Sequence, residues 1–140
     1  MVVILSASKM TTSKLAAEDE IACREAQHLT ERYYNAIDRA RNKVYFLYVD
    51  SATLLWNGNL VEGVENIARF WESVPATDHS VSSLNCQMGS EEVNGCRPII
   101  VLSVGTAVVG ALTHAFSQTL VLVTDDGKYK IFSDRFRYID

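Results

Sequence analysis

The feature that most constrains the fold of this chain is a pair of long strand-like segments that carry no charge. Residues 98–109 and 112–124 are rich in β-branched and aromatic side chains, and neither contains Lys, Arg, Asp or Glu. Because side chains alternate between the two faces of a strand, both faces of these segments are uncharged. An antiparallel sheet with helices on one face normally shows a polar second face, so we expect this second face to be buried by a partner. The alternative is an extra layer formed by the N-terminal arm.

Helical periodicity comes before these strands. Small and apolar residues recur at spacings of three and four within residues 15–43, which predicts a long amphipathic helix. We expect a second, short helix over residues 44–49. A third is expected over residues 64–73, and it ends just before Pro75. Residues 1–14 are expected to form a flexible N-terminal arm, and residues 15–140 a single domain.

Strands dominate the rest of the chain. A short strand over residues 53–56 is expected to end in the turn dipeptide Asn57-Gly58. Longer strands are expected over residues 81–88, 98–109, 112–124 and 128–139, joined at the end by short hairpins. Helices first and strands afterwards indicate an α+β domain.

Composition excludes several classes of function. The formal net charge is −4, and no window interleaves Lys or Arg with aromatic residues, so we expect no direct binding of nucleic acid. The three cysteines, Cys23, Cys86 and Cys96, are an odd number without C-x-x-C spacing, which argues against a disulfide framework or a zinc site. The apolar run at residues 2–5 is too short for a secretion signal or membrane span. We expect a nuclear or cytoplasmic protein with no cofactor and no membrane insertion.

Several short motifs appear in one unbroken order. The most informative are Tyr33-Tyr34-Asn35, Trp56-Asn57-Gly58-Asn59, Phe116-Ser117-Gln118-Thr119 and Ser133-Asp134-Arg135-Phe136-Arg137. Together they resemble the export-related branch of the nuclear transport factor 2 superfamily, over roughly residues 17–140. The resemblance implies a cone-shaped domain, with helices packed on the concave face of a strongly bent antiparallel sheet. The convex face of this fold is used for dimerisation.

The resemblance also implies a partner and a cellular role. Members of the export-related branch pair with the large mRNA export receptor, which carries its own domain of this fold. The heterodimer helps to dock the receptor onto phenylalanine-glycine repeats of the nuclear pore. A protein of this kind is an accessory subunit without a catalytic residue, found in the nucleus and cytoplasm and enriched at the nuclear envelope.

The strand alternation extends this idea to single residues. If Arg137 faces the partner, as the matching arginine of the family does, then Arg135 and Ile139 share its face. The expected interface also includes residues of the neighbouring strands, namely Leu102, Val104, Ser117, Thr119 and Val121. In a symmetric homodimer the two arginines would meet their own copies, which favours a heterodimer. The alternative is a solvated arginine ladder on an edge strand.

Four large aromatic residues suggest a second site. They are Phe46, Trp56, Phe70 and Trp71, and they could line a hydrophobic pocket that receives a phenylalanine of a pore repeat. At these spacings, large aromatic side chains are more often simply core, and we favour that interpretation over a pocket.

The same superfamily includes carriers of the small GTPase Ran and small-molecule isomerases or dehydratases. The founding carrier has an acidic residue where this chain has Asn57, which weakens that alternative. An enzyme would need a base such as Asp38, His114 or Asp134, with a tyrosine as hydrogen-bond donor. We expect non-catalytic roles instead: Asp38 as a solvated helix charge, His114 as a rim or core histidine, and Asp134 paired with a neighbouring arginine.

Overall fold

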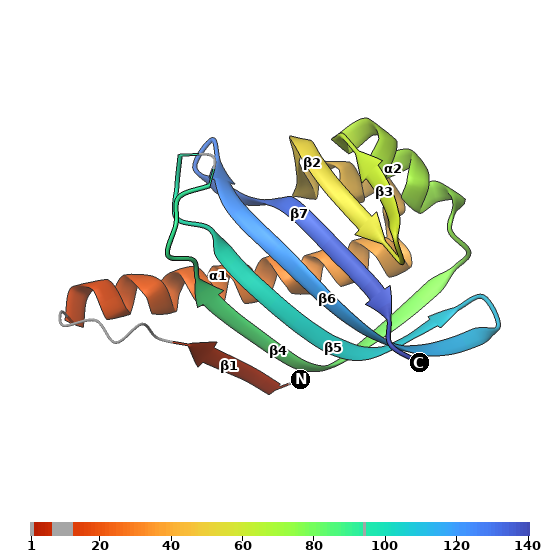
Figure 1. Cartoon of the computed structure of the whole chain (residues 1–140), viewed down its shortest axis with the longest axis horizontal. Coiled ribbons are helices and arrows are strands. Elements are labelled where there is room, and N and C mark those ends of the chain that lie inside the picture. Colours follow the sequence, from red (N-terminus) through yellow and green to blue (C-terminus); the bar gives the residue numbers. More distant parts are fainter. Residues whose placement is uncertain (1, 7–12, 94) are drawn as a thin grey trace.

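The three helices of the described residues lie on one side of a single, strongly curved sheet (Figure 1). The computed structural model describes residues 2–6, 13–93 and 95–140. The helices are α1 (Ser13–Arg39), the 3-10 helix η1 (Arg41–Leu47) and α2 (Val64–Ser73). Helices on the concave face of a bent sheet confirm the expected α+β class.

The sheet has seven described strands, and four of them form an antiparallel meander. The strands are β1 (Val2–Ser6), β2 (Tyr48–Trp56), β3 (Asn59–Glu62), β4 (Thr77–Met88), β5 (Ile99–Val109), β6 (Leu112–Asp125) and β7 (Lys128–Tyr138). Their spatial order is β1-β4-β5-β6-β7-β2-β3. Both β1 against β4 and β2 against β7 run parallel. The sheet is therefore mixed rather than wholly antiparallel, because β2 enters beside the last strand of the meander in the same direction.

The turns that join the strands match their sequence signals. Trp56 pairs with Asn59 across Asn57 and Gly58, whose φ angles are 48° and 84°. Positive φ at both central residues is the geometry that Asn-Gly favours in a two-residue hairpin. The second strand of this hairpin, β3, was not predicted because its four residues are mostly exposed and show no strong alternation.

The boundaries of the first two helices differ from the expectation. The helix predicted over residues 15–43 ends at Arg39, and the one predicted over 44–49 is replaced by η1, which ends at Leu47. The break lies at Ala40, whose backbone leaves the helical region with φ −149° and ψ 60°. Beyond it, the Arg41 guanidinium donates to the Trp71 carbonyl at 2.7 Å and also to that of Val74. These contacts satisfy carbonyls at the end of α2, which sequence periodicity does not report.

The N-terminal segment extends the sheet at one edge. Val2–Ser6 pairs with β4, so this part of the expected arm is a strand, and residues 13 and 14 already belong to α1. The alternative of an N-terminal layer over the uncharged sheet face is wrong for these residues, because they lie beside β4 rather than across the face. The rest of the expected arm includes residues 7–12, which lie outside the described residues.

The core lies between α1 and the concave face of the sheet. Ala26, Leu29 and Ile37 of α1 are buried there. Phe116 of β6 stacks on Phe136 of β7, with ring centroids 5.0 Å apart. Among the described helices, none is long and apolar enough to cross a bilayer.

Gly105 allows the sheet to bend at β4. A Cβ atom at this position would lie 2.0 Å from the Ser80 carbonyl oxygen and 2.9 Å from the Val81 Cα. The register of β4 against β5 shifts between Val81 and Ser83, so the backbone approaches Gly105 at an irregularity.

We expect Gly105→Ala to lower the free energy of unfolding by about 3 kcal/mol, because backbone atoms must move to admit the methyl group. Thr106→Ala, at the exposed neighbour, should change it by less than about 0.5 kcal/mol. Urea unfolding followed by circular dichroism compares the two. Equal stability of both variants would show that the close approach at Gly105 does not matter.

Candidate partner interface

The expected interface residues form two rows across the convex face of the sheet. Leu102 of β5 pairs with Thr119 of β6, which pairs with Arg135 of β7. In the next row, Val104 pairs with Ser117, which pairs with Arg137. Directly paired residues share a face of the sheet, so these six side chains lie on one surface. We call it the convex face below.

The two remaining residues extend this surface. Val121 pairs with Ile100 and Ser133 at the far end of the rows, and it is half-buried. Ile139 follows the end of β7, where its amide donates to the Ala115 carbonyl at 2.9 Å, and its side chain is 58% exposed. The structure thus brings all eight residues to one face, and their role in binding stays a prediction.

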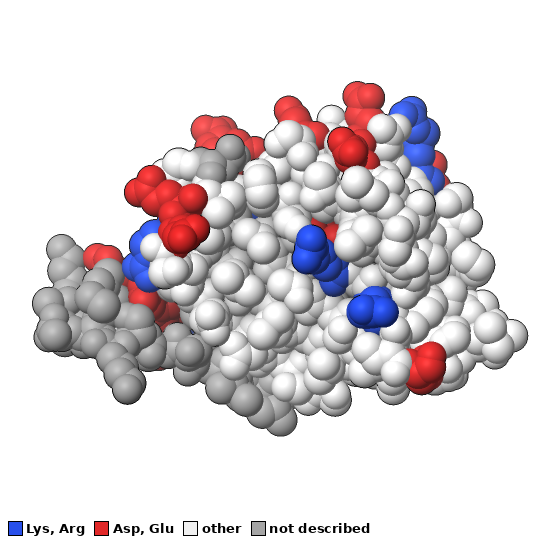
Figure 2. Space-filling model, in the orientation of Figure 1, with Lys and Arg blue, Asp and Glu red and all other residues white. Residues whose placement is uncertain are grey.

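The convex face is nearly free of charge. Figure 2 shows a broad field of uncharged atoms, with two positively charged side chains near its middle and acidic residues mainly at its rim. The strand pairing places Arg135 and Arg137 on this face. Among the described residues, no carboxylate lies within ion-pair distance of either guanidinium. The two arginines are therefore available to an outside anion.

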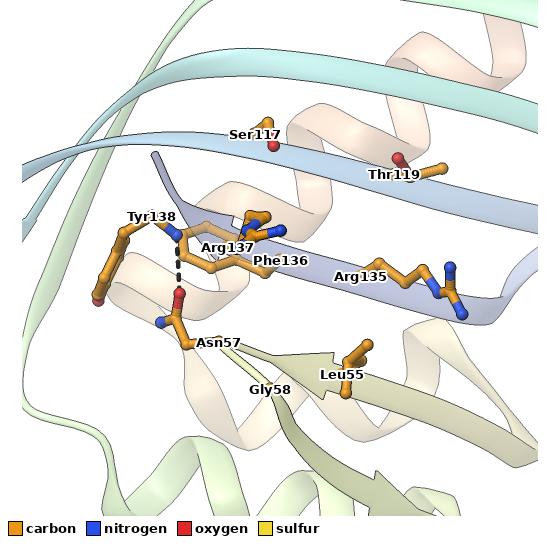
Figure 3. A pocket seen from close by; sticks show the side chains of 9 residues that line it. All are labelled: Leu55, Asn57, Gly58, Ser117, Thr119, Arg135, Phe136, Arg137 and Tyr138. Carbon is orange, nitrogen blue, oxygen red and sulfur yellow. Dashed lines mark hydrogen bonds between the residues drawn. The ribbon is translucent and has the colours of Figure 1, made fainter. Parts of the chain in front are cut away.

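A hollow of about 480 Å³ opens between β6, β7 and the β2–β3 turn. Figure 3 shows Arg135 and Arg137 along β7, with Ser117 and Thr119 beside them on β6 and Leu55 on β2. Two guanidinium groups and two hydroxyls beside aliphatic carbon suit a carboxylate carried on an apolar surface.

Sequence reasoning missed the part of the convex face that β2 and β3 supply. Leu55 pairs with Arg135 on one side and with Leu60 on the other, and Leu60 is 57% exposed. Both therefore continue the row of Leu102 and Thr119. The signal was absent because the parallel pairing of β2 with β7 joins residues about eighty positions apart.

The turn at Asn57 has a structural role at the rim of the hollow. The side-chain oxygen of Asn57 accepts a hydrogen bond from the Tyr138 amide at 2.7 Å, drawn as a dashed line in Figure 3. The backbone amide of Asn57 donates to the Phe136 carbonyl at 2.9 Å. Asn57 thus fastens the β2–β3 hairpin to β7.

The four aromatic residues of the candidate pocket do not lie together. Trp56, Phe70 and Trp71 form a chain of ring contacts, each with centroids 5.4 Å apart, and Trp71 is buried. Phe46 instead lies on η1 and is 70% exposed, beside hollows lined by α1 residues. The structure supports a core role for Trp71, and a pocket at Trp56 and Phe70 stays a prediction.

A closed hydrogen-bond network lies directly behind the convex face. The hydroxyls of Tyr33 and Tyr48 each donate to one carboxylate oxygen of Asp134 at 2.6 Å. The Gln118 amide donates to the other oxygen at 2.7 Å, and the Tyr34 hydroxyl donates to the Gln118 carbonyl. With Asp134 ionised, every donor of this set has an acceptor. The expectation that Asp134 pairs with an arginine is wrong, because Asp134 points inward.

Burial dominates the titration of this network. It raises the pKa of the Asp134 carboxyl, and the hydrogen bonds from Tyr33, Tyr48 and Gln118 oppose the shift without cancelling it. Burial and the neighbouring carboxylate also raise the pKa of the Tyr33 and Tyr48 hydroxyls. Because folding raises the pKa of Asp134, the part of the stability that is linked to its protonation is greatest at low pH and is lost as the pH rises through the folded value, whereas its hydrogen bonds from Tyr33, Tyr48 and Gln118 persist at neutral pH.

The side chain of Asp38 is also largely covered, against expectation, with 8% of it exposed. Its carboxylate contacts His79 Nδ1 at 2.7 Å and accepts hydrogen bonds from the His79 amide at 2.9 Å and the Thr77 hydroxyl at 2.8 Å. The interpretation as a solvated helix charge is wrong, because β4 begins across from this turn of α1 and covers it. Burial would raise the pKa of Asp38, but the hydrogen bonds from His79 and Thr77 together lower it.

We expect Asp38→Asn to be destabilising at pH 7, by about 2 kcal/mol, because it removes hydrogen bonds to a charged group. Since folding lowers the pKa of Asp38, its stabilising effect is present above the unfolded pKa and is lost as the pH falls through the folded value. The difference between wild type and variant should therefore shrink below about pH 4. Urea titrations at pH 7, 5 and 3 measure it, and a constant difference would contradict this role.

His114 lies at the rim of the sheet, as one of its two expected roles predicted. Its ring stacks on Tyr138 with centroids 4.1 Å apart, and its Nδ1 lies 3.3 Å from the Asp140 carboxylate. Within residues 2–6, 13–93 and 95–140, no three His, Cys, Asp or Glu side chains are grouped to hold a metal ion.

Comparison with known proteins identifies the family. Residues 25–138 match the nuclear transport factor 2 (NTF2) domain. The chain belongs to the NTF2 domain family. It is 41% identical over 136 residues to the "NTF2-related export protein" of Caenorhabditis elegans, which covers 95% of this chain and 99% of that protein. It is 37% identical to "NTF2-related export protein 2" of Mus musculus, over 85% and 88% of the two chains.

A solved structure shares the NTF2 fold. The C. albicans Mtr2-Mex67 M domain complex contains a chain that superposes with a TM-score of 0.64, over 81% of this chain and 91% of that one. The identity is 12%, so this likeness speaks for the fold alone. The identities of 41% and 37% to these two export proteins exceed the 30% identity to "Nuclear transport factor 2" of Candida glabrata.

Proposed function

We propose that this chain is the small, non-catalytic subunit of a heterodimeric mRNA export receptor, and that it binds the large subunit through the convex face. The observation that carries the proposal is the composition of this face. It presents exposed apolar side chains around Arg135 and Arg137, which lack a carboxylate partner among the described residues.

The relatives support a role in nuclear transport. The similar proteins from worm and mouse are named NTF2-related export proteins. The structural neighbour from C. albicans was solved as a complex of two proteins, Mtr2 and the M domain of Mex67. A heterodimer with a larger export receptor is consistent with both.

The physical chemistry of the convex face favours a different chain as its partner. Leu102, at 46% exposure, and its apolar neighbours gain free energy when a partner removes them from water. Burying Arg135 and Arg137 requires matching carboxylates, because an unpaired charge is costly without water. A second copy of this chain would bring arginines of its own, whereas a receptor surface can supply the acidic groups.

The candidate catalytic groups support a role without catalysis. Asp134 is buried and accepts hydrogen bonds from tyrosine and glutamine side chains, so it serves the core. Asp38 is held by His79 and Thr77. Both carboxylates have internal partners that explain their burial.

The proposal includes a cellular setting. The heterodimer would dock onto phenylalanine-glycine repeats of the nuclear pore and shuttle between nucleus and cytoplasm, with enrichment at the nuclear envelope. Asn57 favours the export role over that of a Ran-GDP carrier. The founding carrier has an acidic residue at this position, whereas here the Asn57 side chain is hydrogen-bonded to β7 at the turn.

Co-expression with one of two candidate partners tests the proposal. Tagged NTF2-like domain of the large export receptor should retain this chain through purification in high salt. GDP-loaded Ran should not retain it above the background of a bare tag. Capture by Ran and not by the receptor domain would overturn the proposal.

A further inference from the structure

On the helical side of the molecule, another exposed apolar residue is surrounded by positively charged side chains. Phe46 of η1 is 70% exposed, the highest value among the large hydrophobic residues described. It lies between two hollows, of about 600 Å³ and about 440 Å³, and lines both together with Arg32 and Leu47. The Phe46 ring thus stays exposed to water in the folded chain, although large apolar side chains are most often buried.

The charges around Phe46 are mostly of one sign. Arg32, Lys43, Lys128 and Lys130 line the two hollows, against the single carboxylate of Glu25. Lys130 pairs with Asp125 at 3.5 Å, whereas Arg32, Lys43 and Lys128 make no ion pair with a described residue. A local excess of positive charge stands out on a chain whose net charge is −4.

We propose that this Phe46 surface, formed by Phe46, Arg32, Lys43, Leu47 and Lys128, binds an acidic peptide segment with an apolar residue between its carboxylates. The smaller hollow has apolar walls from Ala36, Ala40 and Leu47, which fit an aliphatic or aromatic side chain. The cations that line the two hollows then meet the flanking carboxylates. A nucleic acid fits less well, because it needs a continuous cationic track with stacking faces rather than one hollow for a single side chain.

The Phe46 surface is separate from the convex face. It is built by α1, η1 and the β6–β7 turn, and η1 packs against the helices that cover the concave side. It therefore stays accessible when a partner covers the convex face, and one heterodimer could hold both partners at once. This inference goes beyond the proposed function and does not depend on it.

Fluorescence anisotropy of the full chain with a labelled peptide tests the inference. The probe carries two Glu-Asp pairs around a central Leu-Phe. The comparison probes are the same peptide with Lys for each acid, and single-stranded RNA of equal charge. Phe46→Ser and the double variant Lys43→Glu/Lys128→Glu should each weaken acidic-peptide binding at least about tenfold.

Two matched controls keep the result interpretable. Ile21→Ser removes another exposed apolar side chain, and Arg69→Glu reverses another exposed cation, both outside the two hollows. Both should bind the acidic peptide within about twofold of wild type. Circular dichroism checks that all variants fold. The inference is overturned if the acidic peptide does not bind, if its affinity ignores Phe46, or if RNA binds more tightly and displaces it.

Discussion

Replacing Arg137 with Glu is expected to abolish binding of the large receptor subunit while leaving the isolated chain folded. Arg137 is exposed on the convex face, beside Ser117 and without an intramolecular ion pair among the described residues. Its removal from the free chain therefore costs little. In the complex, Glu would place a negative charge against a receptor carboxylate in a buried setting, which costs about 2–5 kcal/mol or more. Affinity should fall at least about thirtyfold.

Surface plasmon resonance against the immobilised receptor domain measures this loss. Arg39→Glu is the matched control, because Arg39 is exposed on α1, which covers the other face of the sheet. It should bind like wild type. If Arg137→Glu unfolds the chain, the residue is structural; if the variant folds and binds normally, the convex face is not the interface.

Asp134→Ala should cause the largest loss of stability of any single substitution considered. Asp134 is fully buried and accepts from Tyr33, Tyr48 and Gln118. Removing the carboxylate leaves these donors without an acceptor and opens a small void, so the free energy of unfolding should fall by about 3 kcal/mol or more. Urea unfolding at pH 7 measures the loss.

Asp134→Asn separates hydrogen bonding from charge. Asparagine keeps one oxygen for the tyrosine hydroxyls and removes the buried charge, so it should be clearly less destabilising than alanine. It should also abolish the part of the pH dependence that follows from the raised pKa of Asp134. If alanine is tolerated as well as asparagine, the network does not stabilise the sheet in the manner described.

The strand half of the fold was predictable because its signal is local. Uncharged alternation over residues 98–124 placed β5 and β6, and the turn dipeptides fixed the hairpins. Successive residues of the family motifs likewise alternate between the buried face and the exposed face of the sheet. Within two of them, Gln118 and Asp134 point into the buried network while Thr119 and Arg135 point outward. One period-two pattern thus encodes both the core and the candidate interface.

Other features depend on contacts between distant residues and could not be read locally. The parallel pairing of β2 with β7 adds Leu55 to the convex face and makes the sheet mixed. The burial of Asp38 depends on His79, forty-one residues away, so a charge next to Arg39 looked solvated. Arg41, just beyond the end of the first helix, donates to the carbonyls of Trp71 in α2 and of Pro75 after it. Sequence periodicity reports local structure and does not reveal such contacts between distant residues.

The central claim is that the convex face binds a different chain. Light-scattering mass of this chain, first alone and then after mixing with the NTF2-like domain of the large export receptor, tests it most directly. We predict a one-to-one complex with the receptor domain, and self-association or poor solubility of the chain alone. A stable homodimer that forms no complex with the receptor domain would contradict the claim.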